Sequence, residues 1–419
     1  MYHSMNWKRI LLIIAFILLV IILALLMYVL FFAPKKSAPP PIAPAIPTGG
    51  LPTIPGGERV ITTPPVLVPP EAPTALAPGV LVVGTELPQT AQEAVGGKVR
   101  AALVLQDANL NPRRAADGKS VVTFDTQNGK VYRIASNGAL TPLTEQTFSG
   151  AYNVKFSPQT DKAIFQFPDS SNLVYDFINK KSYVLPKHWD KFEFSPAGDQ
   201  LTFKSLGDDP DNQWLAIANI DGTGARGIEN MGDKAGLFTA SWSPSDQIVG
   251  SFRDGVDFNR QKIYFIGKNK ENFKSTTIDG RGLEYIWSPD GDTILYSVYS
   301  TQSEYNPELW VMDAIGESIG NNKRHITVQT CAHKCTFSNN TTVYCAVPKE
   351  LITGAGLLPS YGDAGEDHIY KLDLITGTKE KIAEPPERHT ISSIIVSQDE
   401  SLLYFTDKNS GQMYKIDLK

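Results

Sequence analysis

The sequence has no excess of basic charge and few residues of the kinds that build reactive sites. Its 39 Lys and Arg are outnumbered by 44 Asp and Glu, and the net charge of -5 argues against a nucleic-acid partner. It contains neither a Gly-rich phosphate loop with Lys nor a His-Glu-x-x-His motif. Only 3 Cys are present, all within CAHKCTFSNNTTVYC from Cys331 to Cys345. We therefore expect no metal, no cofactor and no catalytic constellation, and the sequence does not predict an enzyme.

One long apolar run stands near the N-terminus. After a tail of residues 1–9, residues 10–32 contain no charge, Gly or Pro. A bilayer core of roughly 30 Å needs about 20 such residues in a helix, and the run exceeds the 7–15 residues usual for a cleaved signal peptide. Two basic residues flank each end of the run: Lys8 and Arg9, and Lys35 and Lys36. Because the two sides carry equal numbers of basic residues, the positive-inside rule does not decide the orientation. The short tail and its free amine favour an N-terminus inside, which gives a single-pass anchor in the cell membrane with the bulk of the chain extracytoplasmic.

Residues 33–79 are rich in proline. They hold about half of the chain's 29 Pro, and Pro fixes φ and removes backbone donors, so neither helix nor sheet is expected here. In the polyproline form, at about 3.1 Å per residue, the segment would reach on the order of 100 Å. We interpret it as a linker that holds a domain away from the membrane. Docking of a Pro-recognising partner is the alternative.

The remainder of the chain is built from two alternating repeats. The first is an aromatic residue, Ser-Pro, a turn and an apolar strand, as in WSPDGDTILYSV from Trp287. Clear copies begin at Phe156, Phe194 and Trp242, and degenerate copies begin at Ala116, Phe337 and Val396. A second aromatic strand that ends in a turn follows each copy, as in IYKLDLITGTK from Ile369.

These paired units predict an all-β fold. Alternating apolar and polar residues between Gly, Asp and Asn turns are typical of strands and hairpins. A repeat of about 40–50 residues with four short strands is typical of a propeller blade, so seven units predict a seven-bladed β-propeller over residues 80–419. A ring of blades leaves an exposed edge unless its last blade is completed by another strand. We expect residues 80–84, which include the apolar stretch VLVV, to supply that closing strand.

The WSPDGDTILYS string and its relatives resemble the repeats of TolB-like (WD40-like, PD40) β-propellers of bacterial envelopes. The resemblance covers about residues 100–419 and implies an extracytoplasmic protein-binding role. Residues 33–100 offer nothing like the N-terminal α/β domain of TolB, so no Tol-type partnership is implied. Anchor, linker and propeller together are similar to membrane-anchored bacterial propeller proteins.

Several motifs have both a chemical and a structural interpretation, and we favour the structural one for each. The aromatic residues of the first repeat are expected to be structural anchors between blades, although Trp242 and Trp287 would also suit a ligand-binding face. These anchors are Phe156, Phe194, Trp242, Trp287 and Phe337. Gly316-Glu317-Ser318-Ile319-Gly320 fits the G-x-S-x-G nucleophile elbow but occupies the position of a repeat turn. Two sets of acidic residues are expected to shape turns: Asp208, Asp209 and Asp211, and the recurring Asp176, Asp313, Asp373 and Asp417.

The cysteine stretch falls on the sixth repeat. Aligning Phe337 with Trp287 puts Cys335 and Cys345 on successive strands at equal distances from residue 340, so they face each other across a hairpin. Facing Cβ atoms lie about 4.5–5.5 Å apart, close enough for a disulfide after a modest adjustment. We favour that bond; three thiols, or a zinc site that includes His333, are the alternatives. Cys331 and His333 have no assigned role.

The anchor, linker and propeller together predict a membrane-anchored extracytoplasmic scaffold that binds a protein partner. The alternative is a ligand-binding or catalytic propeller with its site at the mouth of the central channel. The long loops 206–213, 299–308 and 349–367 are the places where such a site is expected. A structural or sensory role in the envelope is a third hypothesis.

Overall fold

The computed structural model describes residues 96–271, 273–358, 365–385 and 387–418, which lie in the second of two units of the chain, Gly50–Lys419. The predicted membrane helix at residues 10–32 and the Pro-rich linker at 33–79 lie outside these residues. Within the described ranges, no helix is long and apolar enough to cross a bilayer.

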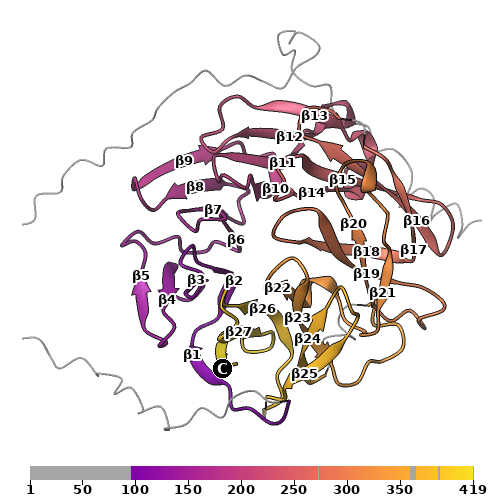
Figure 1. Ribbon diagram of the computed structural model, residues 1–419. Coiled ribbons are helices and arrows are strands. Elements are labelled where there is room, and N and C mark those ends of the chain that lie inside the picture. Colours follow the sequence, from indigo (N-terminus) through magenta and orange to yellow (C-terminus); the bar gives the residue numbers. More distant parts are fainter. Residues whose placement is uncertain (1–95, 272, 359–364, 386, 419) are drawn as a thin grey trace, which may run out of the picture. The chain divides into compact units, whose positions relative to one another are not determined.

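The described chain forms seven antiparallel sheets of four strands, arranged around a common centre as a seven-bladed β-propeller (Figure 1). We number the blades I to VII in chain order. The strands of blade I are β2 (Asn109–Arg114), β3 (Val121–Asp125), β4 (Lys130–Ile134) and β5 (Leu140–Pro142). The strands of blade II are β6 (Asn153–Phe156), β7 (Lys162–Gln166), β8 (Asn172–Asp176) and β9 (Lys181–Leu185). The strands of blade III are β10 (Trp189–Phe194), β11 (Gln200–Leu206), β12 (Gln213–Asn219) and β13 (Arg226–Asn230).

The other four blades repeat the same order. The strands of blade IV are β14 (Phe238–Ala240), β15 (Ile248–Gly255), β16 (Arg260–Gly267) and β17 (Thr276–Asp279). The strands of blade V are β18 (Arg281–Trp287), β19 (Thr293–Tyr299), β20 (Glu308–Asp313) and β21 (Arg324–Ile326). The strands of blade VI are β22 (Cys335–Phe337), β23 (Thr342–Pro348), β24 (Asp367–Asp373) and β25 (Lys379–Ala383). Blade VII combines β26 (Ile391–Val396), β27 (Leu402–Asp407) and β28 (Met413–Asp417) with β1 (Ala102–Leu105).

The Ser of the first repeat explains why that motif recurs. It directly follows the innermost strand of its blade, is buried, and accepts a hydrogen bond from the backbone at the start of the next strand. Four copies show this bond: Lys162 N to Ser157 Oγ, Gln200 N to Ser195 Oγ, Thr293 N to Ser288 Oγ and Leu402 N to Ser397 Oγ, all at 2.9–3.1 Å. The motif therefore closes the tight turn between the two innermost strands.

The turn also brings neighbouring blades into close contact. Gly291 has φ +78°, a left-handed conformation that glycine adopts without cost, and a Cβ there would lie 2.4 Å from the backbone nitrogen of Ser245 in blade IV. The aromatic anchors pack near the same turns. Phe156, Phe194, Trp242 and Phe337 are buried, whereas Trp287 is half-buried and donates its indole N–H to Ser241 Oγ at 2.8 Å.

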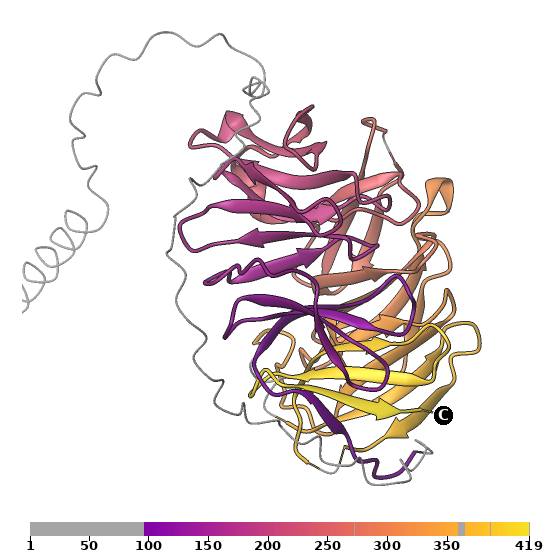
Figure 2. The same cartoon turned by 90° about the vertical axis from the view of Figure 1, so that its left-hand side faces the viewer.

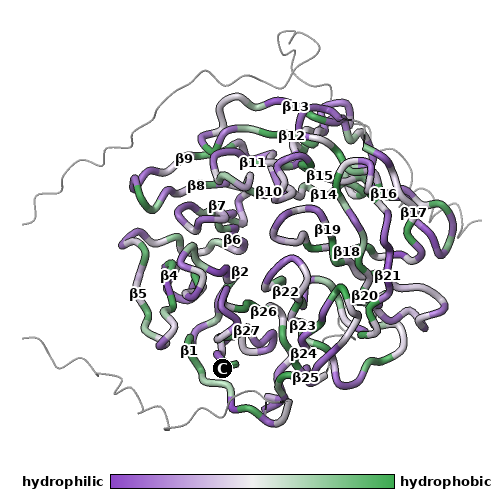
Figure 3. The backbone as a smooth tube through the Cα atoms, in the orientation of Figure 1, coloured by the Kyte–Doolittle hydropathy of each residue, from purple (hydrophilic) through white to green (hydrophobic). Residues whose placement is uncertain are grey.

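The apolar core consists of seven clusters, one between each pair of adjacent blades. Between blades I and II, Phe124 and Phe165 meet edge to face while Phe148 stacks on Phe165 at 3.7 Å. Between blades VII and I, Leu105, Tyr404 and other apolar residues of blade VII pack on the apolar side chains of β3 and β4. Because the strands are short, Figure 3 shows brief green stretches that alternate with purple along each blade. Each blade thus buries its apolar faces only by contact with two neighbours.

The strand that closes the ring is not the one predicted. β1 pairs antiparallel with β28, with Leu103 opposite Tyr414 and Leu105 opposite Met413. In Figures 1 and 2 the indigo start of the described chain accordingly lies beside the yellow C-terminal strands. The prediction that residues 80–84 close blade VII was wrong about this position, and those residues lie outside the described ranges. Residues 80–84 were chosen because they are strongly apolar, but an outermost strand buries few side chains and does not need such a sequence. In β1, Leu105 is the buried residue.

Residue Leu105 provides a direct test of this closure. Leu105→Ala removes a side chain that is 4% exposed, so we expect the free energy of unfolding to fall by about 2–4 kcal/mol. Leu103→Ala, in the same strand but 45% exposed, should change it by less than about 0.5 kcal/mol. Chemical denaturation of both variants provides the comparison. Equal stabilities of the two variants would show that β1 does not close the ring in solution.

Candidate functional site

The two cysteines that were expected to pair form the innermost hairpin of blade VI. Cys335 on β22 lies directly opposite Cys345 on β23, and a disulfide joins them across a Cα–Cα distance of 4.1 Å. The turn between them is held by Asn339, whose Oδ1 accepts hydrogen bonds from two backbone N–H groups. Cys345 is fully buried in the apolar cluster between blades V and VI, so the disulfide fixes the wall of that cluster.

A short helical turn, η4 (Ala332–Lys334), places the other residues of the cysteine stretch. Lys334 is buried, and its Nζ lies 2.8 and 2.7 Å from the two carboxylate oxygens of Asp367 at the start of β24. One of these oxygens also accepts the backbone N–H of Ile391 in blade VII at 2.6 Å. His333 points elsewhere, with its Nδ1 2.8 Å from Oε2 of Glu284 on β18. This buried Lys–Asp pair was not predicted, because its two members are 33 positions apart in the chain.

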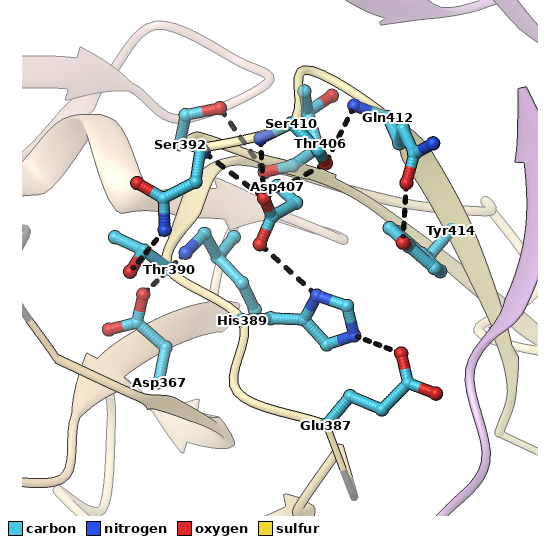
Figure 4. Close-up of polar contacts among 12 residues, drawn as sticks. Asp367, Glu387, His389, Thr390, Ser392, Thr406, Asp407, Ser410, Gln412 and Tyr414 are labelled. Atoms are coloured by element: carbon cyan, nitrogen blue, oxygen red, sulfur yellow. Dashed lines mark hydrogen bonds and ion pairs between the residues drawn. The ribbon is translucent and has the colours of Figure 1, made fainter. Parts of the chain in front are cut away.

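A second buried polar network adjoins this pair in blade VII (Figure 4). His389 Nδ1 lies 3.1 Å from Asp407 Oδ2, and Glu387 approaches the other ring nitrogen at 3.9 Å. Burial raises the pKa of Asp407, but hydrogen bonds from Ser410 and His389 outweigh it and lower that pKa below its ordinary value. Although an Asp–His pair is also a catalytic arrangement, Asp407 Oδ1 accepts the backbone N–H groups of the β27–β28 turn. We therefore interpret the network as structural.

Three consecutive blades contribute loops to one continuous surface, which we call the loop platform. It consists of residues 256–259 between β15 and β16, 300–307 between β19 and β20, and 349–358 after β23. Five of its apolar side chains are at least half exposed: Val256, Phe258, Ile352, Leu357 and Leu358. Such a group of exposed apolar residues is typical of an interaction surface.

Hydrogen bonds between the loops hold the platform together. Gly354 N donates to Glu304 O at 3.0 Å, and Gly356 N donates to Tyr305 O at 2.8 Å. Glu304 and Tyr305 have φ values of 53° and 60°, a strained left-handed conformation for side-chain-bearing residues. Gly356 is needed for the close approach, because a Cβ there would lie 2.6 Å from Tyr299 Cβ. Thr301 extends the contact to blade IV by donating to Asn259 Oδ1 at 3.4 Å.

Two pockets border the platform. The larger, of about 590 Å³, lies between blades IV and V and combines aromatic, acidic and amide side chains. Its lining residues are Asp257, Phe258, Asn259, Arg260, Asp279, Ser300, Gln302, Glu308 and Trp310. The second, of about 450 Å³, lies between blades V and VI and shares Glu308. The loops predicted at 299–308 and 349–367 thus contribute residues to these two pockets. The loop at 206–213 instead contains a short turn, η1 (Pro210–Asn212).

Charged side chains also gather on the innermost strands around the centre of the ring. Lys155 Nζ on β6 lies 2.7 Å from Glu193 Oε2 on β10. Burial lowers the pKa of Arg113 on β2, with Glu193 opposing and Arg114 adding to the effect. Burial raises the pKa of Tyr285 on β18, whose hydroxyl lies 3.0 Å from Ser251 Oγ. Glu193 is thus the carboxylate that faces both Lys155 and Arg113 in this wall.

The remaining motifs occupy turns. Gly316–Ser318 forms a single 3₁₀ turn, η3, and not the junction of a strand with a long helix that a nucleophile elbow requires. Asp209 caps η1 by accepting the backbone N–H of Asp211 at 3.0 Å. Asp176 and Asp373 each accept two backbone N–H groups in the turns that follow β8 and β24. These carboxylates therefore stabilise the turns in which they lie by accepting hydrogen bonds from nearby backbone N–H groups.

Comparison with known proteins shows similarity in fold. No protein-family model and no curated protein matches the chain. Among solved structures, an oligogalacturonate lyase in complex with manganese aligns with a TM-score of 0.52 and 13% identity, covering 76% of this chain and 91% of that one. The Cps50 (Swd1) β-propeller domain of Myceliophteria thermophila aligns with a TM-score of 0.52 and 9% identity, covering 76% and 100%. The β-propeller domain of the Trilobed protease from Pyrococcus furiosus, described as having an open velcro topology, aligns with a TM-score of 0.51 and 15% identity, covering 74% and 96%.

These proteins differ in role while sharing one architecture, so the comparisons establish the seven-bladed β-propeller and nothing finer. At the ring closure this chain has a strand, β1, that completes blade VII from the N-terminal side.

The disulfide gives a prediction that thiol counting checks. Without reductant, the unfolded chain should react with an alkylating reagent at one Cys, since Cys331 lies outside the disulfide. Replacing Cys335 and Cys345 together by Ala should lower the free energy of unfolding by roughly 2–3 kcal/mol, because the bond closes a short loop. Reductant should destabilise the wild-type chain and leave the double variant unchanged. Alkylation of three cysteines would exclude the bond.

Proposed function

We propose that the chain is a membrane-anchored, extracytoplasmic β-propeller that binds a protein partner through the loop platform. The repeats' resemblance to TolB-like (PD40) propellers supports a binding role outside the cytoplasm. The apolar residues 10–32 and the Pro-rich residues 33–79 support a tethered arrangement. The Cys335–Cys345 disulfide supports an oxidising compartment, because such bonds are rare where thiols are kept reduced.

The loop platform is the observation that carries the binding role. Its apolar side chains come from loops that are already hydrogen-bonded to one another, so little conformational entropy would be lost when a partner docks. Asp257 within the platform is ion-paired with Arg260 at its border, with 2.7 Å between Oδ2 and Nη2. Apolar side chains with a polar border suit a protein surface of similar composition.

A site-specific photocrosslinker would test the platform in intact cells. Placed at Phe258, which is 71% exposed, it should form adducts with a defined partner. Placed at Ile178, which is 74% exposed on blade II, it should not. In addition, replacing Phe258 and Leu357 together by Ser should weaken recovery of that partner by about tenfold or more, as for loss of buried interface anchors. Identical adducts from both positions, or none from either, would contradict the proposal.

Deletion and protease accessibility would test the anchor. Removal of residues 10–32 should release the protein from the membrane fraction, since these residues supply the apolar span. In intact cells that express the full-length protein, a protease added outside should cut within residues 33–79 and release a folded propeller. A deleted chain that stays with the membranes, or a linker that only becomes accessible after lysis, would overturn the anchor or its orientation respectively.

Ligand binding at the mouth of the central channel is the second candidate function. The charged residues Arg113, Lys155 and Glu193 on the innermost strands favour it. Ligand binding would become the preferred function under two conditions. The crosslinker at Phe258 would have to yield no protein adduct, and replacement of Phe258 and Leu357 by Ser would have to leave the protein's activity in cells unchanged.

A further inference from the structure

Three metal-binding side chains meet where blades V and VI adjoin. Glu284 comes from the innermost strand β18, and Cys331 and His333 come from the segment that leads into β22. One ligand atom from each of the three lies within 4.8 Å of the other two. The pairing of Glu284 with His333 is already close, at 2.8 Å between Oε2 and Nδ1. The cluster thus combines a thiol, an imidazole and a carboxylate, all of which can bind a metal ion.

The backbone around the cluster is fixed from both sides. Ala332, between the two ligand-bearing residues, is fully buried and donates its N–H to Ser297 Oγ on β19 at 3.0 Å. Ser297 is the strand partner of Glu284, so one register position of blade V holds both the carboxylate and the segment from the next blade. Lys334 anchors the following residue through its buried pair with Asp367. The three side chains are therefore brought together by the fold.

We propose that Glu284, Cys331 and His333 bind a single Zn²⁺ ion, or a similar thiophilic divalent cation. With bonds of about 2.3 Å to sulfur and about 2.0–2.1 Å to nitrogen and oxygen, tetrahedral ligand atoms lie roughly 3.3–3.6 Å apart. The side chains of His333 and Glu284 are 49% and 48% exposed, so small rotations can bring the atoms from their present spacing to this one. Solvent or a partner side chain would complete the fourth position.

The donor set also determines the class of metal. Thiolate and imidazole favour Zn²⁺ over Mg²⁺ or Ca²⁺, which prefer sites made only of oxygen. Binding converts the Cys331 thiol to a thiolate, and its proton passes to solvent. One thiolate, one carboxylate and a neutral imidazole then balance the two positive charges of the ion. This site is independent of the scaffold function proposed above.

The chain offers a matched control. His325 Nε2 lies 3.7 Å from Glu308 Oε1 on the outer part of blade V, a second partly exposed His–Glu pair. The other two cysteines of the chain are joined to each other, so that pair has no thiol available to it. A metal held merely by exposed His and Glu would bind there equally well.

Metal titration of the purified full-length chain tests the site. The protein is treated with chelator, kept free of reductant so that the disulfide stays closed, and titrated with Zn²⁺, Co²⁺ and Ca²⁺. We expect one Zn²⁺ per chain and a near-ultraviolet thiolate-to-cobalt band with Co²⁺. Cys331→Ser should abolish the band, and His333→Ala and Glu284→Gln should each weaken Zn²⁺ binding by about 10- to 100-fold.

Three results would overturn the site. The first is equal Zn²⁺ affinity in the wild-type, Glu284→Gln and His333→Ala chains, and the second is a loss of binding in His325→Ala as large as theirs. Because Glu284 and His333 are exposed, their variants should keep the wild-type melting temperature, so a loss of binding can be separated from unfolding. Stoichiometric Ca²⁺ binding that Cys331→Ser leaves unchanged would likewise contradict a thiolate ligand.

Discussion

The structure depends on apolar contacts between blades. Each four-stranded sheet is too small to bury its own faces, and the seven apolar clusters all lie between neighbouring sheets. The contact between blades VII and I therefore contributes to stability in the same way as the other six. Strand β1 completes that contact by placing Leu105 among residues from both blades. The loop platform, the disulfide and the cluster of Glu284, Cys331 and His333 all rest on this closed framework.

The number of blades was predictable because the turn chemistry repeats in the chain. In four copies of the first repeat the Ser follows the last residue of an innermost strand, and its buried hydroxyl accepts the same backbone hydrogen bond. The closing strand was not predictable in this way, because β1 has no repeat motif and only one fully buried side chain. The apolar stretch at residues 80–84 was preferred on hydrophobicity, a property that an outermost strand hardly requires.

The same distinction applies to the sites. The facing positions of Cys335 and Cys345 followed from hairpin symmetry, a local property of the sequence. In contrast, Glu284 meets His333 only because blades V and VI are juxtaposed, and Lys334 meets Asp367 only because the folded chain brings η4 to the start of β24. No local pattern predicts such contacts. Two of the three platform loops were anticipated, at 299–308 and 349–367, whereas the loop at 256–259 was not. The hydrogen bonds from Gly354 and Gly356 that join the two anticipated loops depend on tertiary structure. Contacts within one hairpin could therefore be predicted from the sequence, whereas contacts made by tertiary structure could not.

The path of the chain just before β1 has a mechanical consequence. Gly96 and Val99 donate backbone hydrogen bonds to Ile382 and Glu384 in blade VI, and the chain then crosses to pair with β28 in blade VII. Tension applied to the chain ahead of Gly96 would reach these bonds before any other part of the propeller. The load would be divided between two blades whose contact is reinforced by the Lys334–Asp367 pair and its bond to Ile391. The backbone bonds of Gly96 and Val99 thus join the start of the described chain to the junction of the ring's last two blades.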